Sequence, residues 1–342
     1  MKGVVFLGDQ KLELREFPRA EPRGGEVLIQ MKASGLCGSD LNYYRTPRAQ
    51  LPEHVLNSIK GHEPCGIVVA LGPSTRNVKV DDRVMIHHYV GCGGCKYCLA
   101  GWAQLCVKGR KIQGTDVHGA HCDFMVCPDT CCVRLPDELS FEEGSMLSCG
   151  TGTAYQALKR LDISGRDTLA VFGQGPVGMS AMMLAKAMGA RVVAIDTVRE
   201  RLESSKRFGA DEIINAVEAD PVAAIKELTR AEGADATMDC SGSEQGRVNA
   251  LRSVRIWGRA CFVGERGTTT FDISELFLRK QLTVYGSWTF STHGLAEVAS
   301  FVVEHKVPIR SMISHRFSIS QADEAYKLFA AGRTNKAVFV WP

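Results

Sequence analysis

The pattern of hydrophobic and polar positions changes near residue 150. Before that point, short runs of apolar and β-branched residues are separated by glycine, proline and aspartate, which is typical of β-strands joined by turns. We expect strands at residues 11–15, 27–31, 66–70 and 123–126. No run in this half has the period of a helix longer than a few turns, so the first half is predicted to be rich in β-structure.

From about residue 151 the pattern becomes an alternation of strands and helices. The alternation predicts six strands, at residues 168–172, 191–196, 211–214, 236–240, 260–263 and 282–285. A helix is expected at residues 179–188, and another up to residue 230 that starts with Asp220 as N-cap and Pro221 in the first turn. Six strands alternating with helices favour a doubly wound parallel sheet. After about residue 290 the elements are expected to become shorter and to rejoin the first domain.

The composition is typical of a globular chain of two domains and argues against some classes of binding partner. The chain has 342 residues, of which 45% are hydrophobic and 23% charged. The formal net charge is only +3 and no run of lysine and arginine occurs, so neither nucleic acid nor an anionic membrane is an expected partner. The amino end lacks a long apolar run, and no window is long enough to span a bilayer. We therefore expect a cytoplasmic, reducing setting, in which clustered cysteines bind metal more often than they form disulfides.

Four of the thirteen cysteines form a dense motif. Cys92, Cys95, Cys98 and Cys106 have the spacing C-x2-C-x2-C-x7-C. Two-residue spacers place thiolates within reach of one tetrahedral ion, and four thiolates leave a zinc ion no open position. The motif thus predicts a structural zinc site. One alternative is an iron–sulfur cluster, which would have a redox role. The other is that the cysteines bind no metal and are free or paired in disulfides.

A glycine-rich loop follows the predicted strand at residues 168–172. It reads Gly173-Gln174-Gly175-Pro176-Val177-Gly178, and Asp196 ends the next strand. This context is the one that a dinucleotide-binding fingerprint requires: Gly173 for the tight turn, Gly175 for close approach of the pyrophosphate and Gly178 for helix packing. Asp196 would accept hydrogen bonds from ribose hydroxyls and repel a 2′-phosphate, which favours NAD over NADP, although Arg199 and Arg201 soften that preference. The alternative is a tight turn without a ligand.

A second set of reactive side chains lies upstream in glycine-flanked loops. Cys37, Ser39 and Asp40 follow Gly35, and His62 and Glu63 follow Gly61. Each residue alone is a weak signal. Together with a nicotinamide site they indicate a mixed sulfur and nitrogen metal site, whose third protein ligand the motif itself does not identify.

These motifs, in this order, resemble the zinc-dependent alcohol dehydrogenases of the medium-chain dehydrogenase/reductase family. The likeness extends over nearly the whole chain and includes Gly72, Asp82-Arg83-Val84, Leu135-Pro136 and Leu139-Ser140-Phe141. It implies a GroES-like β-barrel catalytic domain at residues 1–150 and 290–342, with the structural zinc lobe at about 91–107. It also implies an inserted Rossmann NAD-binding domain at residues 151–289.

The resemblance assigns roles to individual residues of the catalytic domain. Cys37, His62 and Cys149 match the ligands of the catalytic zinc, and Glu63 matches a residue that ligates the zinc in some members and stands behind it in others. Asp40 matches the carboxylate that orients the histidine, and Ser39 the hydroxyl that begins a proton relay. His88 falls where an aromatic residue shapes the pocket, so a histidine there favours a polar substrate.

The proton relay and the cofactor contacts complete the implied site. The position of the relay's terminal histidine holds Asn42, whose amide cannot take up a proton near neutral pH. The proton therefore leaves through water or through another base such as His54. By position, Thr153 should contact the nicotinamide, Arg201 the adenosine ribose and Lys336 the pyrophosphate.

The sequence thus predicts a zinc-dependent enzyme that transfers hydride between an alcohol and NAD, with a polyol or secondary alcohol favoured. Two zinc ions per subunit and a homodimer or homotetramer are expected. The alternatives are an aldehyde reductase that uses NADP(H) and a non-catalytic dinucleotide-binding relative. A non-catalytic descendant would not need Cys37, Ser39, His62 and Cys149 together, and all four are present.

Overall fold

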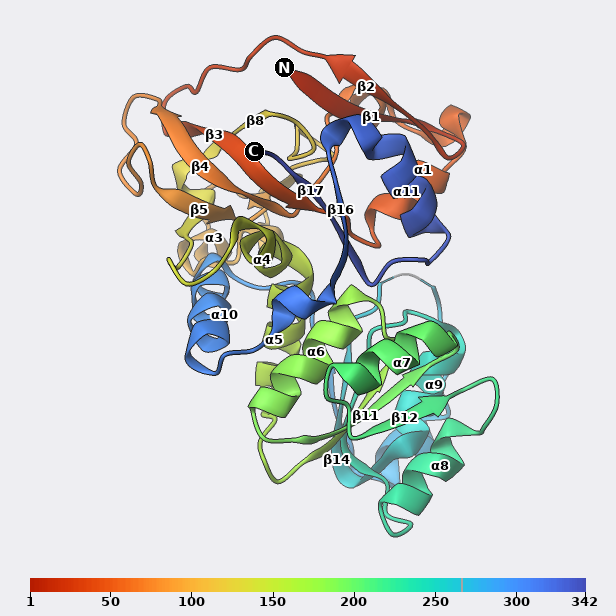
Figure 1. The fold of residues 1–342 in the computed structure, drawn as a ribbon. Helices are drawn as coiled ribbons and strands as arrows, with labels where there is room; N and C mark the ends of the chain where they lie inside the picture. Colours follow the sequence, from red (N-terminus) through yellow and green to blue (C-terminus); the bar gives the residue numbers. More distant parts are fainter. Residues whose placement is uncertain (266) are drawn as a thin grey trace. The chain divides into compact units, whose positions relative to one another are not determined.

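The computed structural model describes residues 1–265 and 267–342, which form two compact units (Figure 1). The first unit comprises Met1–Gly152, Phe290–Glu304 and Ile313–Pro342. The second comprises Thr153–Thr289 and His305–Met312. The short segment His305–Met312 is thus part of the second unit, whereas the sequence pattern placed it with the first.

A seven-stranded sheet organises the first unit. Its order is β16-β17-β3-β4-β5-β9, and β8 pairs with β3. The strands are β3 (Glu26–Gly35), β4 (Pro64–Leu71), β5 (Arg83–Ile86), β8 (Phe124–Pro128), β9 (Cys132–Arg134), β16 (Ile313–Phe317) and β17 (Lys336–Val340). Two small antiparallel pairs complete it, β1 (Lys2–Gly8) with β2 (Lys11–Glu16) and β6 (Tyr89–Val90) with β7 (Lys111–Ile112). The long strand β3 alternates inward-facing Val27, Ile29 and Met31, all fully buried, so it is the centre of the core.

The helices of the first unit are short, with one exception. They are α1 (Asp40–Arg45), α2 (Glu53–Asn57), α3 (Lys96–Leu99), α4 (Phe141–Met146), α10 (Thr292–Glu304) and α11 (Ala322–Ala330). Single turns of 3-10 helix lie at Arg48–Gln50, Ala103–Leu105, Asp129–Cys131 and Ile319–Gln321, and a π-helical turn at Leu147–Thr151. The expectation of only short elements after residue 290 was wrong, because α10 has 13 residues.

The second unit is built on a six-stranded parallel sheet, as predicted. Its order is β12-β11-β10-β13-β14-β15, which is the doubly wound Rossmann arrangement with the reversal of strand order at β10. The strands are β10 (Thr168–Phe172), β11 (Arg191–Asp196), β12 (Glu212–Asn215), β13 (Ala234–Asp239), β14 (Val254–Phe262) and β15 (Thr283–Gly286). In such sheets a ligand binds at the carboxyl ends of the strands beside the reversal.

Helices cover the sheet of the second unit. They are α5 (Gly152–Leu161), α6 (Pro176–Ala187), α7 (Arg199–Arg207), α8 (Pro221–Leu228) and α9 (Glu244–Ser253), with a 3-10 turn at Ile309–Met312 and a π-helical turn at Ser274–Leu278. Figure 1 shows α6 and α7 lying along the strands, and both contact β11. Asp220 caps α8 as predicted, since its side chain accepts a hydrogen bond of 3.0 Å from the Val222 N–H. Across residues 1–265 and 267–342, every helix is too short or too polar to cross a membrane.

Candidate active site and metal centres

Three sulfur and nitrogen donors converge in the first unit. Cys37 follows β3, His62 precedes β4, and Cys149 lies in the π-helical turn after α4. Their ligand atoms all lie within 4.8 Å of one another. The two Sγ atoms are 3.9 Å apart. Two thiolates on a tetrahedral zinc, each at about 2.3 Å, stand about 3.8 Å apart, so the cluster fits a zinc ion.

The π-helical turn positions Cys149. Helix α4 begins with a capping box, in which Ser140 accepts from the Glu143 N–H and the Glu143 side chain accepts from the Ser140 N–H. At its carboxyl end the backbone widens into the turn Leu147–Thr151, an irregularity that is common at functional sites. The Ser148 hydroxyl donates to the Pro64 carbonyl over 2.8 Å. Cys149 is thereby tied to the segment that carries His62.

Asp40 orients the histidine. One of its oxygens lies 2.9 Å from His62 Nδ1, and the other accepts the Cys37 N–H at 3.0 Å. Burial alone would raise the pKa of Asp40, but the adjacent imidazole lowers it to about 2, so the group is a carboxylate. With Nδ1 donating to Asp40, His62 Nε2 is left as the metal-binding nitrogen. The Ser39 hydroxyl lies 3.2 Å from this nitrogen and 3.4 Å from Cys37 Sγ.

Glu63 and Lys336 form a buried pair beside this cluster. Glu63 Oε2 accepts from Lys336 Nζ, which also donates to the Leu36 carbonyl at 2.9 Å. Glu63 Oε1 is buried and has no hydrogen-bond partner among the residues described. Burial raises the pKa of Glu63, although the Lys336 ammonium beside it opposes this shift. Lys336 is engaged with Glu63 and Leu36, and a pyrophosphate contact at this residue stays a prediction.

His88 and His54 occupy different environments. His88 is buried, with Nδ1 3.1 Å from the Ser148 carbonyl oxygen and its ring centre 5.0 Å from that of His62. It therefore lies next to the predicted ligands. His54 is exposed, and its Nε2 lies 3.8 Å from Asp116 Oδ1. The structure gives His54 no hydrogen bond to the cluster within the described residues.

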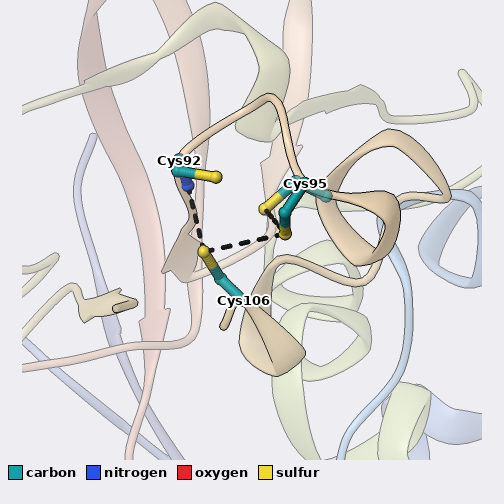
Figure 2. Close-up of side chains that lie close together, drawn as sticks. Cys92, Cys95 and Cys106 are labelled. Atoms are coloured by element: carbon teal, nitrogen blue, oxygen red, sulfur yellow. Dashed lines mark hydrogen bonds between the residues drawn. The ribbon is translucent and has the colours of Figure 1, made fainter. Parts of the chain in front are cut away.

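The four cysteines of the dense motif come together on a separate lobe. The Sγ atom of Cys95 lies 3.5 Å from that of Cys98 and 4.0 Å from that of Cys106, distances that again fit thiolates on one tetrahedral ion. Figure 2 shows Cys92, Cys95 and Cys106 facing one another, with the Cys92 N–H donating to Cys106 Sγ at 3.4 Å. Backbone N–H groups, above all that of Cys98, lower the pKa of Cys95 to about 6, whereas burial and the neighbouring thiols raise the pKa of Cys98 to about 12. A metal ion with four such donors has no position left for a substrate.

The glycine loop of the second unit leaves room for a phosphate. Gly173 has a φ of +91°, and a Cβ there would lie 2.8 Å from the Ser241 nitrogen. A Cβ on Gly178 would lie 1.8 Å from the Gly173 carbonyl oxygen, so strand and helix approach too closely for any side chain. Gly175 caps α6, with Pro176 at the first helical position and Val177 after it, and a Cβ on Gly175 would meet no protein atom within 4 Å. The open helix amino terminus can therefore bind an anion.

Asp196 organises the loop beside this opening. Its Oδ1 accepts the N–H groups of Thr197 at 2.7 Å and Val198 at 2.9 Å, and its Oδ2 accepts that of Gln174. Arg201 Nη1 lies 3.9 Å from Oδ2. Arg199 instead pairs with Glu218. Contacts of Asp196 and Arg201 with a ribose stay predictions. The nicotinamide contact of Thr153, which is buried in the first turn of α5, also stays a prediction.

Sequence reasoning missed several residues that build these sites. Gln174 is fully buried and joins the loop to β10 and α7, with Nε2 donating to the Val171 carbonyl at 2.8 Å and Oε1 accepting from Ser205 at 3.1 Å. Gln174 occupies a variable position of the glycine motif, so the motif does not single it out. Tyr326 and His121 stand behind Asp40, far away in the sequence. Gly61 is a local signal for His121 but not for Tyr326, because a Cβ at position 61 would lie 2.3 Å from His121 Nδ1.

Comparison with known proteins agrees with this arrangement. Residues 23–137 match the alcohol dehydrogenase GroES-like domain, and residues 176–304 match the zinc-binding dehydrogenase domain. An uncharacterized zinc-type alcohol dehydrogenase-like protein, YphC of Escherichia coli strain K12, is 40% identical over 350 residues, covering 100% of this chain and 99% of that protein. Sorbitol dehydrogenase of Bacillus subtilis strain 168 is 30% identical, covering 95% and 92%.

The fold has solved counterparts of the same kind. Alcohol dehydrogenase TADH from Thermus sp. ATN1 superimposes with a TM-score of 0.90 at 28% identity, covering 99% of each chain. The donor sets and the glycine loop fit the zinc and the nicotinamide dinucleotide that such enzymes use. This chain therefore belongs to the zinc-dependent alcohol dehydrogenases of the medium-chain dehydrogenase/reductase family and is an oxidoreductase that acts on alcohols.

Proposed function

We propose that the enzyme oxidises a polyol or another secondary alcohol with NAD, using one catalytic zinc and one structural zinc per chain. The observation that carries this proposal is the cluster of Cys37, His62 and Cys149, with its 3.9 Å sulfur separation and the Asp40 carboxylate on His62. Three protein donors leave one position of a tetrahedral ion open to a substrate oxygen. The four-cysteine lobe has no such opening and serves stability.

The chemistry divides between the bound groups and the chain. When bound by Cys37, His62 and Cys149, zinc would supply a positive charge that lowers the pKa of the alcohol hydroxyl, and a bound nicotinamide would supply the hydride acceptor. Asp40 keeps the His62 ring in the orientation that aims Nε2 at the metal. Ser39, within 3.2 Å of that nitrogen, is placed to accept the proton of the substrate hydroxyl.

The proton then leaves Ser39 through water. Asn42 cannot take it up, and the exposed His54 pairs with Asp116. The substitution His54→Ala should therefore leave the dependence of kcat/KM on pH unchanged between roughly pH 6 and 8. Loss of an ionisation step in that range would instead assign the base to His54.

NAD is proposed over NADP because of Asp196. Its carboxylate is only 6% exposed, so a 2′-phosphate nearby would meet a negative charge. Arg201 Nη1 lies 3.9 Å from Asp196 Oδ2 and offsets part of that charge. Arg199 instead forms an ion pair with Glu218. A preference for NAD, incomplete rather than absolute, is the expected result.

The substrate class follows from His88 and from the relatives. The buried His88 ring lies beside His62, and because its Nδ1–H donates to the Ser148 carbonyl, its Nε2 can accept a hydrogen bond from a second hydroxyl of the substrate. A relative that shares 30% identity over most of both chains is a sorbitol dehydrogenase. A polyhydroxylated or secondary alcohol is therefore proposed over a simple primary alcohol.

One experiment tests these assignments together. Primary, secondary and polyhydroxylated alcohols are offered with NAD and with NADP, and the reduced nicotinamide is followed by its ultraviolet absorbance. We expect the largest kcat/KM for a polyol or secondary alcohol with NAD. A preference for aldehyde reduction with NADPH would favour the aldehyde reductase, and no turnover by the zinc-loaded protein with any substrate would favour a non-catalytic relative.

Assembly and location are proposed from the family and the composition. We propose a cytoplasmic homodimer or homotetramer. The thirteen cysteines, none of which is paired in a disulfide among the described residues, suit a reducing compartment. Sedimentation of the purified protein measures the assembly directly, and a monomer would contradict it.

A further inference from the structure

A chain of buried polar side chains extends behind Asp40 into the core of the first unit. Ser34, on β3, lies with its Oγ 2.8 Å from His121 Nδ1. His121 Nε2 lies 2.8 Å from the Tyr326 hydroxyl of α11, which lies 3.4 Å from Asp40 Oδ2. Ser34, His121 and Tyr326 are each fully buried. Such groups are costly to bury unless each is hydrogen-bonded, so the order of donors and acceptors in the chain is informative.

That order is fixed from the Asp40 end. The carboxylate only accepts, so the Tyr326 O–H donates to it and the phenol oxygen must accept from His121 Nε2–H. Burial lowers the pKa of His121 to about 4, so the ring is neutral and carries a single proton, on Nε2. His121 Nδ1 is then an acceptor, and the Ser34 hydroxyl donates to it. Every link has one donor and one acceptor.

Packing holds the chain in this arrangement. The His121 ring lies against Gly61, where a Cβ would be only 2.3 Å from His121 Nδ1. Gly61 has a φ of +90° and immediately precedes His62. The same ring meets Phe339 edge to face at 4.8 Å. The Tyr326 ring meets Phe6 edge to face at 4.9 Å. Side chains confined by such contacts have few other rotamers, so they can support a neighbouring site with little motion.

Asp40 connects this chain to two predicted metal ligands. Its Oδ2 accepts from both Tyr326 and the Cys37 N–H, and its Oδ1 faces His62 Nδ1. A shift of the carboxylate would therefore move the Cys37 backbone and rotate the His62 ring together. Groups that support metal ligands in this way commonly change metal affinity by about 10–100-fold when they are removed.

We propose that Tyr326 and His121 are positioning residues for the catalytic zinc, which act by holding Asp40, and through it His62 and Cys37, in the metal-binding geometry. The inference rests on the proposed function, because it assumes that Cys37, His62 and Cys149 bind the catalytic zinc. Within the described residues, the structure gives neither residue a hydrogen bond to the donor atoms of Cys37, His62 or Cys149. The contact of 3.4 Å between Tyr326 and Asp40 is long, so the effect belongs at the low end of the range, near tenfold.

The test compares two tyrosines of one hydrophobic cluster. Tyr326→Phe removes only the hydroxyl that contacts Asp40. Tyr44→Phe is the matched control, since Tyr44 is equally buried, its ring centre lies 5.4 Å from that of Tyr326, and the structure gives its hydroxyl no hydrogen bond within the described residues. Zinc release from the full-length, zinc-loaded enzyme to a coloured chelator is followed for each variant. The phase that disappears in Cys37→Ser identifies the catalytic zinc.

Tyr326→Phe should release the catalytic zinc about tenfold faster than the wild type, and Tyr44→Phe within about twofold of it. Release of the structural zinc should be unchanged in both. Ser34→Ala is a smaller change, at the end of the hydrogen-bonded series farthest from Asp40, and should accelerate zinc release by less than Tyr326→Phe. It replaces Tyr326→Phe as the test variant if Tyr326→Phe is unstable. The unfolding midpoints of all variants are measured in parallel.

Two results would overturn the proposal: release from Tyr326→Phe at the wild-type rate, or equal acceleration by both tyrosine variants. Equal acceleration would show that both substitutions act by loosening the hydrophobic core and not through the contact of Tyr326 with Asp40. A wild-type enzyme without a release phase that depends on Cys37 would overturn the proposed function itself, and with it this inference. The two failures are therefore distinguishable.

Discussion

Replacing Lys336 with methionine should leave a carboxylate buried without its partner. The side chains of Glu63 and Lys336 are each 1% exposed, and Glu63 Oε1 already lacks a hydrogen-bond partner among the described residues. Methionine keeps most of the volume and the apolar contacts of lysine but cannot donate to Glu63 Oε2. The substitution therefore isolates the ion pair from the packing around it.

The expected loss follows from the cost of an uncompensated buried charge. Breaking a buried pair by removing one partner costs about 3–5 kcal/mol. For a domain of this size, each kcal/mol lowers the unfolding midpoint by roughly 2–4 °C, so a fall on the order of 6–20 °C is expected. Removing the Lys336 ammonium, which opposes the raised pKa of the buried Glu63, favours protonation of this carboxylate and so places the loss in the lower part of this range.

A double-mutant cycle separates the charge from the volume. The zinc-loaded wild type, Lys336→Met, Glu63→Leu and the double variant are unfolded by heat and by denaturant. The double variant should recover most of the stability lost in Lys336→Met, because apolar residues of similar volume can replace a buried ion pair at little cost. A loss below about 1 kcal/mol in Lys336→Met, or a double variant as unstable as the sum of the single ones, would refute the reasoning.

Two further predictions concern the second unit. Gly178→Ala and Gly175→Ala should both weaken NADH binding but should differ in stability. The Gly178 Cβ would overlap the Gly173 carbonyl at 1.8 Å, so this variant should lose both stability and NADH binding, whereas Gly175→Ala, with no protein atom within 4 Å, should lose binding alone. Fluorescence titration with NADH and thermal unfolding check both, and normal binding in Gly175→Ala would place the phosphate elsewhere. Asp196→Ser should raise kcat/KM with NADP relative to NAD by about tenfold or more, because it removes the charge that repels a 2′-phosphate. An unchanged cofactor ratio from steady-state kinetics would show that Asp196 only organises the loop through its bonds to Thr197 and Val198.

Local patterns predicted the second unit well. The β10 and β11 ranges agree with the structure at both ends, because buried parallel strands are continuous apolar runs bounded by turn residues. Helix α6 starts three residues earlier than its apolar pattern, at Pro176, since a helix can begin on the glycine motif itself. The length of α10 was missed because Gly294 lies in its first turn and three valines follow, and both residue types have low helix propensity.

The candidate site was harder to predict because its residues are brought together by the fold. The four-cysteine motif lies within fifteen residues, and spacing alone indicates one metal. Cys149 is separated from Cys37 by 112 residues and lies in a π-helical turn, so only the family resemblance singled it out. Tyr326 reads as an ordinary apolar position of an amphipathic helix. Its contact with His121 spans 205 residues, and no local signal announces it.

The central claim is that the scattered cluster performs the chemistry while the dense motif supports the fold. Zinc content and alcohol oxidation, measured side by side for Cys37→Ser and Cys95→Ser, test this claim most directly. The wild type should hold two zinc ions per chain. Cys37→Ser should lose one zinc and its turnover while remaining folded, and Cys95→Ser should lose the other and its stability while the folded fraction still oxidises the alcohol. A single zinc per chain that survives Cys37→Ser but not Cys95→Ser would contradict the account.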